Sequence, residues 1–154
     1  MIEFFVPGTP RVKGNMRSVC RYGKGRCKPA GKDCHPFTTE GYKENLKVWM
    51  RAIVAASLAH RPLQPIAGAV HVDLHFEFRR PLAPKHDYPF HKGDGEKLER
   101  AVMDALQTKG KWGGVLIVDD NQRVTWSGSK RWSTEREGVL IRIRPLGAEQ
   151  ETLL

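Results

Sequence analysis

The strongest pattern along the chain is an alternation of apolar and polar residues over residues 69–79. The apolar positions are Val70, Val72, Leu74, Phe76 and Phe78, and the polar positions are His71, Asp73, His75, Glu77 and Arg79. Because successive side chains of a strand point to opposite faces of a sheet, this alternation predicts a half-buried strand. Shorter apolar or alternating runs predict further strands at residues 2–6, 115–118, 124–126 and 139–143.

Two other segments place apolar residues three and four positions apart, which is the spacing of one face of a helix. The first helix is expected to start near Glu40, after Thr38 or Thr39 as its cap, and to end near His60. Its apolar face comprises Tyr42, Leu46, Trp49, Met50, Ile53 and Ser57. The second helix follows Asp94, and its apolar face comprises Leu98, Ala101, Val102, Ala105 and Leu106. Strands and helices therefore interleave irregularly, which is typical of one α+β or mixed α/β domain.

Two stretches lack this periodicity and are expected to form loops. Residues 80–93 contain three prolines, which favour an irregular connection. Residues 11–37 contain many basic and few large apolar residues, so we expect a long loop or arm that orders on a partner. We therefore expect one domain over residues 1–145, with the basic arm inside it, and a flexible tail over residues 146–154.

The distribution of charge indicates the kind of partner. The chain has 154 residues and a formal net charge of +9. Residues 1–35 hold eight basic and two acidic residues, and residues 123–144 hold six and two, whereas residues 36–122 hold twelve and eleven. Basic flanks of this kind are typical of proteins that bind a polyanion, with nucleic acid favoured over an anionic membrane surface. The composition excludes an acidic solvating protein, a collagen-like chain and a coiled coil.

The start of the chain bears on its location. Its first apolar run ends at Pro7, far short of the roughly 20 residues that a membrane-spanning helix needs. This run also lacks the basic and apolar regions of a signal peptide, so we expect a cytosolic protein with no membrane partner.

The cysteines bear on zinc binding. Cys20, Cys27 and Cys34 are evenly spaced and His35 follows the last of them. Thiolates and a histidine could hold zinc, but the usual pairs of ligands two residues apart are missing. Free thiols in a basic loop are therefore favoured over a zinc site.

Four acidic residues stand where two of the predicted elements begin or end. Asp94 and Glu96 lie at the start of the second helix, and Asp119 and Asp120 follow the apolar run at 115–118. A helix start and a strand end can meet in space, and carboxylates that converge there form a hard oxygen site for Mg²⁺ or Mn²⁺. Such a metal assists phosphodiester hydrolysis, so acids grouped in a basic protein favour a nuclease.

Each of these acids also has a plain structural role open to it. Asp94 could cap the helix, and Glu96 could interact with the helix dipole and with Arg100 four residues later. Asp119 and Asp120 could simply form a turn. The spacing alone therefore leaves both a nuclease and a non-catalytic DNA-binding module open.

The acids lie within longer motifs. Residues 92–106 read KGDGEKLERAVMDAL and are followed by Trp112 and by VDDNQRV at 118–124, while residues 7–14 read PGTPRVKG. Together these segments resemble the RusA family of Holliday junction resolvases. That family has a Lys-Pro-Asp-x-Asp-Asn-Leu-x-Lys pattern opening a helix that ends in Asp-Ala-Leu, and then a Trp-x-Asp-Asp-x-Gln-Val segment. The similarity covers most of residues 1–144.

The resemblance implies a fold, an activity and a set of site residues. The fold is a small mixed sheet packed against two helices. The activity is that of a homodimeric, Mg²⁺-dependent endodeoxyribonuclease that nicks opposed strands of a four-way junction in the bacterial cytoplasm, whether the gene is bacterial or from a phage. The family's metal-binding acids correspond to Asp94, Glu96 and Asp120, and we add their neighbour Asp119. Catalytic basic positions correspond to Arg100 and Lys130.

The chain departs from the family pattern at several of these positions. Glu96 replaces an aspartate, Lys97 replaces an asparagine and Gly93 replaces a proline. Arg100 replaces a lysine, which keeps a positive charge but removes a group that can lose its proton. A few extra residues precede Asp119. An endonuclease for another branched or duplex DNA therefore stays open as a third interpretation.

DNA contacts are expected from basic and aromatic side chains around these motifs, and no small-molecule substrate is expected. The proposed phosphate-binding residues are Arg11, Lys13, Arg17, Lys92, Lys97 and Arg131. Trp126 and Trp132 could stack on unpaired bases, although a core or dimer contact is favoured for at least one of them. His71, Asp73 and His75 could bind a metal, but a solvated strand face is favoured.

Overall fold

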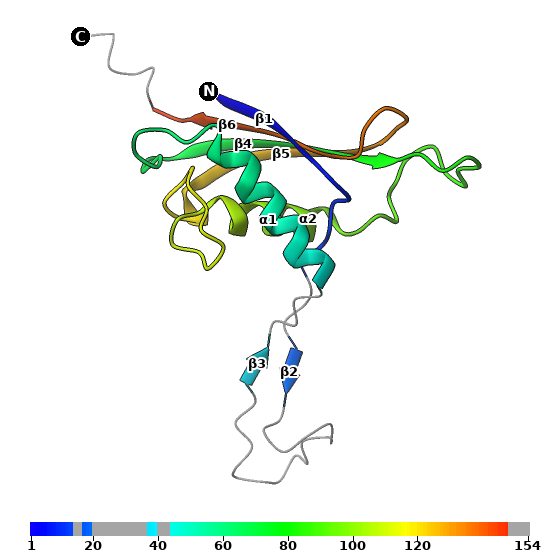
Figure 1. Cartoon of the computed structure of the whole chain (residues 1–154), viewed down its shortest axis with the longest axis horizontal. Helices are drawn as coiled ribbons and strands as arrows, with labels where there is room; N and C mark the ends of the chain where they lie inside the picture. The colour runs from blue at the N-terminus through cyan, green and yellow to red at the C-terminus, as the bar shows by residue number, and fades with distance from the viewer. Residues whose placement is uncertain (14–16, 20–36, 40–43, 148–154) are drawn as a thin grey trace.

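A four-stranded mixed sheet carries two helices on one of its faces (Figure 1). The computed structural model describes residues 1–13, 17–19, 37–39 and 44–147. The sheet has the order β1 (Ile2–Pro7), β6 (Gly138–Pro145), β4 (Val70–Arg79), β5 (Arg123–Ser133). Strand β6 runs antiparallel to both β1 and β4, and β5 runs parallel to β4. The predicted fold class, one small α+β domain, is confirmed.

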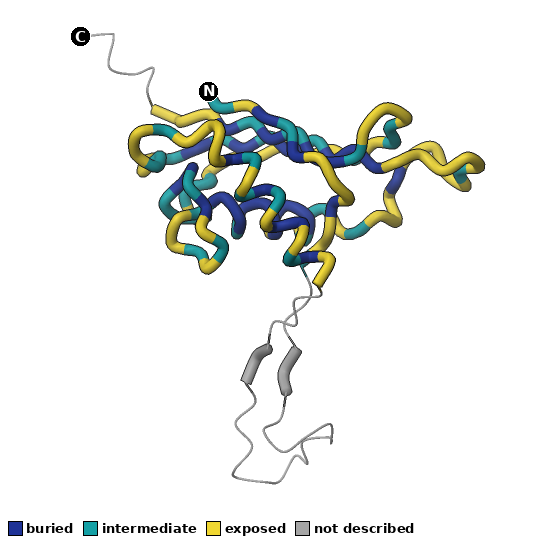
Figure 2. Tube along the Cα trace, viewed as in Figure 1, coloured by how far each residue is buried: buried dark blue, intermediate teal, exposed yellow. Residues whose placement is uncertain are grey.

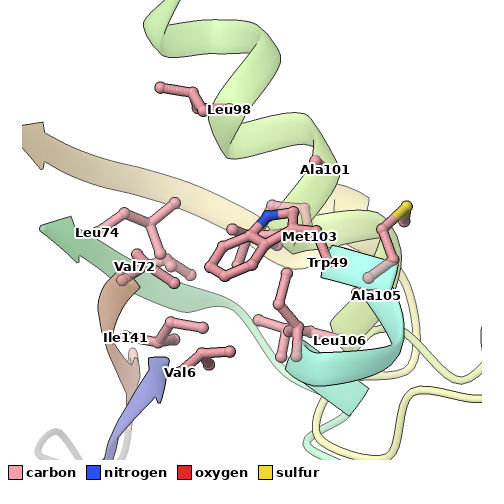
Figure 3. Close-up of a cluster of buried hydrophobic side chains, with 14 of the residues drawn as sticks. Val6, Trp49, Val72, Leu74, Leu98, Ala101, Met103, Ala105, Leu106 and Ile141 are labelled. Carbon is pink, nitrogen blue, oxygen red and sulfur yellow. The ribbon is translucent and has the colours of Figure 1, made fainter. Parts of the chain in front are cut away.

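The helices are α1 (Glu44–Leu58) and α2 (Gly95–Leu106), and they pack on each other and on the sheet. Their predicted apolar faces are buried within the described part of the chain, as are the five apolar residues of β4. Figure 2 shows this buried layer between the helices and the strands. In the close-up of Figure 3, Trp49 of α1 lies between α2 residues such as Leu98 and sheet residues such as Leu74 and Ile141. Burial of these faces supplies most of the driving force for the fold.

Several predictions about elements differ in detail from the structure. Residues 11–37 are not one continuous loop, because β2 (Arg17–Val19) pairs with β3 (Phe37–Thr39). Both threonines expected to cap the first helix belong to β3. The helix is described over α1 (Glu44–Leu58), and residues 40–43, where its start was predicted, lie outside the described residues. Residues 14–16 and 20–36 of the predicted arm lie outside the described residues. The four residues considered as zinc ligands are among them.

The apolar run at 115–118 is not a strand. Leu116 and Ile117 are buried, and Ile117 makes only isolated bridges to Ile66 and Gln107. The run lies against the end of α2, where the Leu116 amide donates to the carbonyl of Leu106 at 3.2 Å. Its apolar side chains therefore fill the core beside the helix, and the backbone has no strand to pair with along its length.

Strand β5 is much longer than the predicted 124–126. It runs for 11 residues, and its register with β4 is continuous from His71 to Arg79. Glycine and serines at residues 127–129 weaken the sequence signal for a strand. Pairing with β4, which is distant in sequence, decides the structure here.

The face of β4 that points away from the helices is polar, as predicted. His71 bonds to Thr125 at 2.7 Å and to Asp73 at 2.9 Å, and His75 bonds to Ser129 at 2.8 Å. These side chains satisfy one another across β4 and β5, which favours the solvated-face interpretation over a metal site. In the described residues, neither helix is long and apolar enough to cross a membrane.

Candidate active site

A cavity of about 330 Å³ lies between the N-terminal half of α2, the short 3-10 helix η1 (Asp120–Gln122) and the start of β5. It is lined by Glu96, Glu99, Arg100, Met103, Asp120, Asn121, Arg123 and Trp126. The fold thus brings together three of the predicted site residues, Glu96, Arg100 and Asp120, from segments that are separate in sequence. Polar side chains dominate the lining, as a site for a charged ligand requires.

Helix α2 begins beside this cavity, and Asp94 caps the N-terminus of the helix. The Asp94 side chain accepts a hydrogen bond from the Glu96 amide at 3.0 Å. This bond satisfies one of the free N–H groups at the helix start. Asp94 itself does not line the cavity, so the structure shows the capping role for this residue, and its role as a metal ligand stays a prediction.

The loop before Asp94 is held by Lys130 of β5. The Lys130 ammonium donates to the carbonyl of Gly93 at 2.8 Å and to that of Phe90 at 3.2 Å. Gly93 has a φ of +91°, which a glycine adopts without strain. Lys130 therefore positions the start of α2 through the backbone, and in this structure it makes contact with Gly93 rather than with the cavity.

The other pair of acids sits at η1, where Asp119 is the cap. Its side chain accepts from the Asn121 amide at 3.0 Å, and the Gln122 side chain accepts from the Asp119 amide at 2.8 Å. Gln122 also donates to the carbonyls of Ile66 and Gly68, both at 2.7 Å, which ties η1 to the chain before β4. These bonds hold the adjacent Asp120 at the cavity wall.

Asp119 and Asp120 have opposite electrostatic environments. The hydrogen bond from the Asn121 amide, followed by the one from Lys109 at 3.1 Å, lowers the pKa of Asp119. Burial raises the pKa of Asp120, and the neighbouring Asp119 and Asp104 raise it further. Asp120 is thus a carboxylate in the cavity whose negative charge is disfavoured by its surroundings. A cation in the cavity would relieve this repulsion.

Two lining residues, Glu99 and Arg123, were not singled out by sequence reasoning. Glu99 is only 3% exposed and forms an ion pair with Arg123, three residues after Asp120. The available signal was weak: Glu99 is a charged residue beside the apolar face of α2. Its burial depends on an arginine that only the tertiary structure brings close.

The predicted DNA-binding residues are spread around the molecule. Lys13 pairs with Asp104 of α2 at 2.5 Å, and its amide donates to the carbonyl of Lys97. Arg131 pairs with Glu77 on the outer face of the sheet. Among the other predicted residues, Lys92 lies over the ring of Trp132, Arg11 lines a separate hollow near Trp49, and Arg17 is in β2. These positions do not test whether the side chains contact DNA, so the DNA contacts of all six residues stay predictions.

The donor atoms of the cavity suit a hard divalent cation. Carboxylates of Glu96 and Asp120 and the amide of Asn121 supply oxygen ligands, and Mg²⁺ is commonly held by one or two carboxylates together with water. Across the described ranges, no three His, Cys, Asp or Glu side chains form a ready metal cluster. The four predicted acids therefore do not converge as a set, and the fit to a cation rests on Glu96 and Asp120.

Comparison with known proteins agrees with the motifs. The sequence matches the model of the family described as Endodeoxyribonuclease RusA over residues 7–144. No curated protein matches the chain. The matched range contains β4, β5, both helices, the cavity and all of β6 except Pro145, whereas β1 precedes it except for Pro7. The chain therefore belongs to the RusA endodeoxyribonuclease family.

Proposed function

We propose that this protein resolves four-way DNA junctions by divalent-metal-dependent phosphodiester hydrolysis, acting as a homodimer. The observation that carries the proposal is the cavity in which Glu96 and Asp120 meet Arg100. Paired cuts in opposed strands need two sites related by a two-fold axis, which a dimer supplies. We place this activity in the bacterial cytoplasm.

Glu96 and Asp120 would hold Mg²⁺ or Mn²⁺ in the cavity. The metal, when bound, polarises the phosphoryl oxygen and lowers the pKa of a bound water. Arg100, one turn after Glu96 on α2, faces the same cavity and donates to a phosphate oxygen. Because an arginine does not lose its proton near neutral pH, Arg100 stabilises charge in this proposal and transfers no proton.

A non-catalytic DNA-binding module is the second candidate. The observation in its favour is that Asp94 and Asp119, two of the four predicted metal ligands, act as helix caps. Neither Glu96 nor Asp120 is the cap of its helix, although the Asp120 side chain also accepts a hydrogen bond from the Asn121 amide. The two candidates therefore differ in what they predict for Glu96 and Asp120.

The test is cleavage of a synthetic four-way junction with Mg²⁺, with and without EDTA, by the wild type, Asp120→Asn and Glu96→Gln. Glu44→Gln is a matched control, since Glu44 is also a first-turn glutamate of a helix but lies on α1. We expect cleavage by the wild type and the control, and a loss of at least about a hundredfold in both site variants, with binding retained. Binding without cleavage by the wild type would leave the non-catalytic module. Equal cleavage of linear duplex would indicate a nuclease of other specificity.

A further inference from the structure

Glu99, Arg123 and Trp126 form a connected group along one wall of the cavity. Glu99 is buried beneath the guanidinium of Arg123, and the Arg123 side chain is 31% exposed. The Arg123 guanidinium carbon lies 5.7 Å from the centre of the Trp126 ring. All three side chains line the cavity that holds Glu96 and Asp120. The group thus runs from a buried carboxylate, through a cation, to a half-exposed aromatic ring.

The buried carboxylate fixes the position of the guanidinium. A buried ion pair adds little to stability when compared with apolar packing, so stability alone gives a weak reason for it at a cavity wall. A guanidinium has more N–H donors than one carboxylate can accept, and the partly exposed side of Arg123 keeps donors for a second anion. Holding the side chain in advance lowers the entropy lost when that anion binds.

The ring of Trp126 is also placed by its surroundings. Trp126 is 45% exposed, an unusual state for so large an apolar side chain. It lies on the same side of β5 as Gly128, because these residues pair with Val72 and Leu74 of β4, which face the core. A Cβ atom at Gly128 would come within 2.9 Å of the ring, so the glycine leaves the space that the ring occupies.

We propose that Arg123 and Trp126 form a nucleotide subsite beside the cleavage site, with Glu99 as the positioning residue. Arg123 binds a phosphate next to the one that is cut, and Trp126 stacks on the adjoining base. Aromatic stacking on a base and a guanidinium on a phosphate are the two contacts by which proteins hold a single strand. The inference deepens the proposed function and rests on it for the identity of the neighbouring site.

The test measures binding of a fluorescein-labelled four-way junction in EDTA, so that no strand is cut. We expect Arg123→Ala and Trp126→Ala each to weaken binding about tenfold, and Trp126→Phe to recover most of the loss. Arg123→Ala should also lower the slope of log K against log salt by about one. The matched control is Arg142→Ala, which removes an arginine from an ion pair with Glu3 on β1. It should bind within about twofold of the wild type.

A double-mutant cycle tests Glu99 as a positioning residue. Glu99→Gln should weaken binding in the wild-type background and have no further effect in the Arg123→Ala background, whereas a purely structural role would give additive losses. Intrinsic fluorescence gives an independent readout, because stacking of an added oligonucleotide should quench the wild type more than Trp126→Phe. Thermal unfolding identifies any variant that fails to fold. If Arg123→Ala fails to fold, the salt slope of Arg123→Lys is measured in its place.

Several outcomes would overturn the subsite. One is an equal loss for Arg142→Ala and Arg123→Ala. Another is a change of oligomeric mass in Trp126→Ala by sedimentation, which would make the ring a subunit contact. A wild type that binds in EDTA but does not cut with Mg²⁺ refutes the proposed function while these binding measurements still decide the subsite. A wild type that cuts while Arg123→Ala binds normally refutes the subsite alone.

Discussion

Glu77 offers the sharpest prediction about stability, because it is a carboxylate buried on the polar face of the sheet. It is 1% exposed, and it accepts hydrogen bonds from Arg136 at 2.9 and 3.0 Å and from Arg131 at 2.6 Å. The bonds from Arg136, and then those from Arg131, lower the pKa of Glu77 from its ordinary value of 4.5 to about 2. The two arginines therefore stabilise the ionised form in the folded state.

The size of the effect follows from linkage between protonation and folding. A tenfold change in proton affinity is worth about 1.4 kcal/mol, so the ionised Glu77 contributes roughly 3 kcal/mol to the free energy of unfolding. Because the folded-state pKa is the lower one, this contribution is complete above about pH 4.5 and is lost as the pH falls towards 2. Glu77→Gln should remove about that amount at neutral pH, and its stability should depend less on pH over this range.

Urea unfolding followed by tryptophan fluorescence, at a series of pH values between about 2.5 and 7, measures both quantities. Glu3→Gln is the matched control, because Glu3 pairs with Arg142 on the same face of the sheet but is 44% exposed. An exposed pair of this kind is worth less than about 1 kcal/mol. If the wild type and Glu77→Gln lose stability in parallel between pH 5 and pH 2.5, the reasoning is refuted.

Three further predictions concern the backbone around the cavity and the sheet. Gly93→Pro, which restores the family residue, should lower cleavage because proline cannot adopt the φ of +91°; junction cleavage rates measure it, and an unchanged rate would contradict the observed loop. Lys130→Met should raise KM and lower kcat, because it removes the hydrogen bond to the carbonyl of Gly93 that holds the start of α2. A change confined to junction affinity would instead indicate that Lys130 contacts DNA directly. Gly138→Ala should destabilise the fold by at least about 2 kcal/mol in urea unfolding, because its Cβ would lie 2.1 Å from the carbonyl oxygen of Val6; normal stability would show that β1 can shift.

Periodicity predicted the elements whose burial is one-sided. Strand β4 and helix α2 each bury a continuous row of side chains, from Val70 to Phe78 and from Leu98 to Leu106, so the spacing in sequence reports the spacing in space. No residue of strand β5 is buried, and its length is set by pairing with β4. No local pattern carries that information, which explains why only its first part was predicted.

The candidate site, like the sheet, could be predicted only in part from the sequence. Acids at a helix start and after an apolar run indicated where Glu96 and Asp120 would meet. Which acids would cap helices and which would face the cavity depends on backbone angles that composition does not report. Glu99 was missed because a glutamate on a helix is ordinarily exposed, and its partner Arg123 is contributed by another element.

The acids in the otherwise basic chain divide into two kinds when their surroundings are compared. Several have a basic partner in the fold: Glu77 with Arg131 and Arg136, Glu99 with Arg123, Asp104 with Lys13, and Asp119 with Lys109. Asp120 is different, because burial and two neighbouring aspartates raise its pKa. This environment beside Glu96 is the one expected of the metal ligand that we propose for Asp120. A divalent cation would reverse the local electrostatics and make the carboxylate favourable. The basic flanks would then bring the DNA backbone to acids that, without the metal, would repel it.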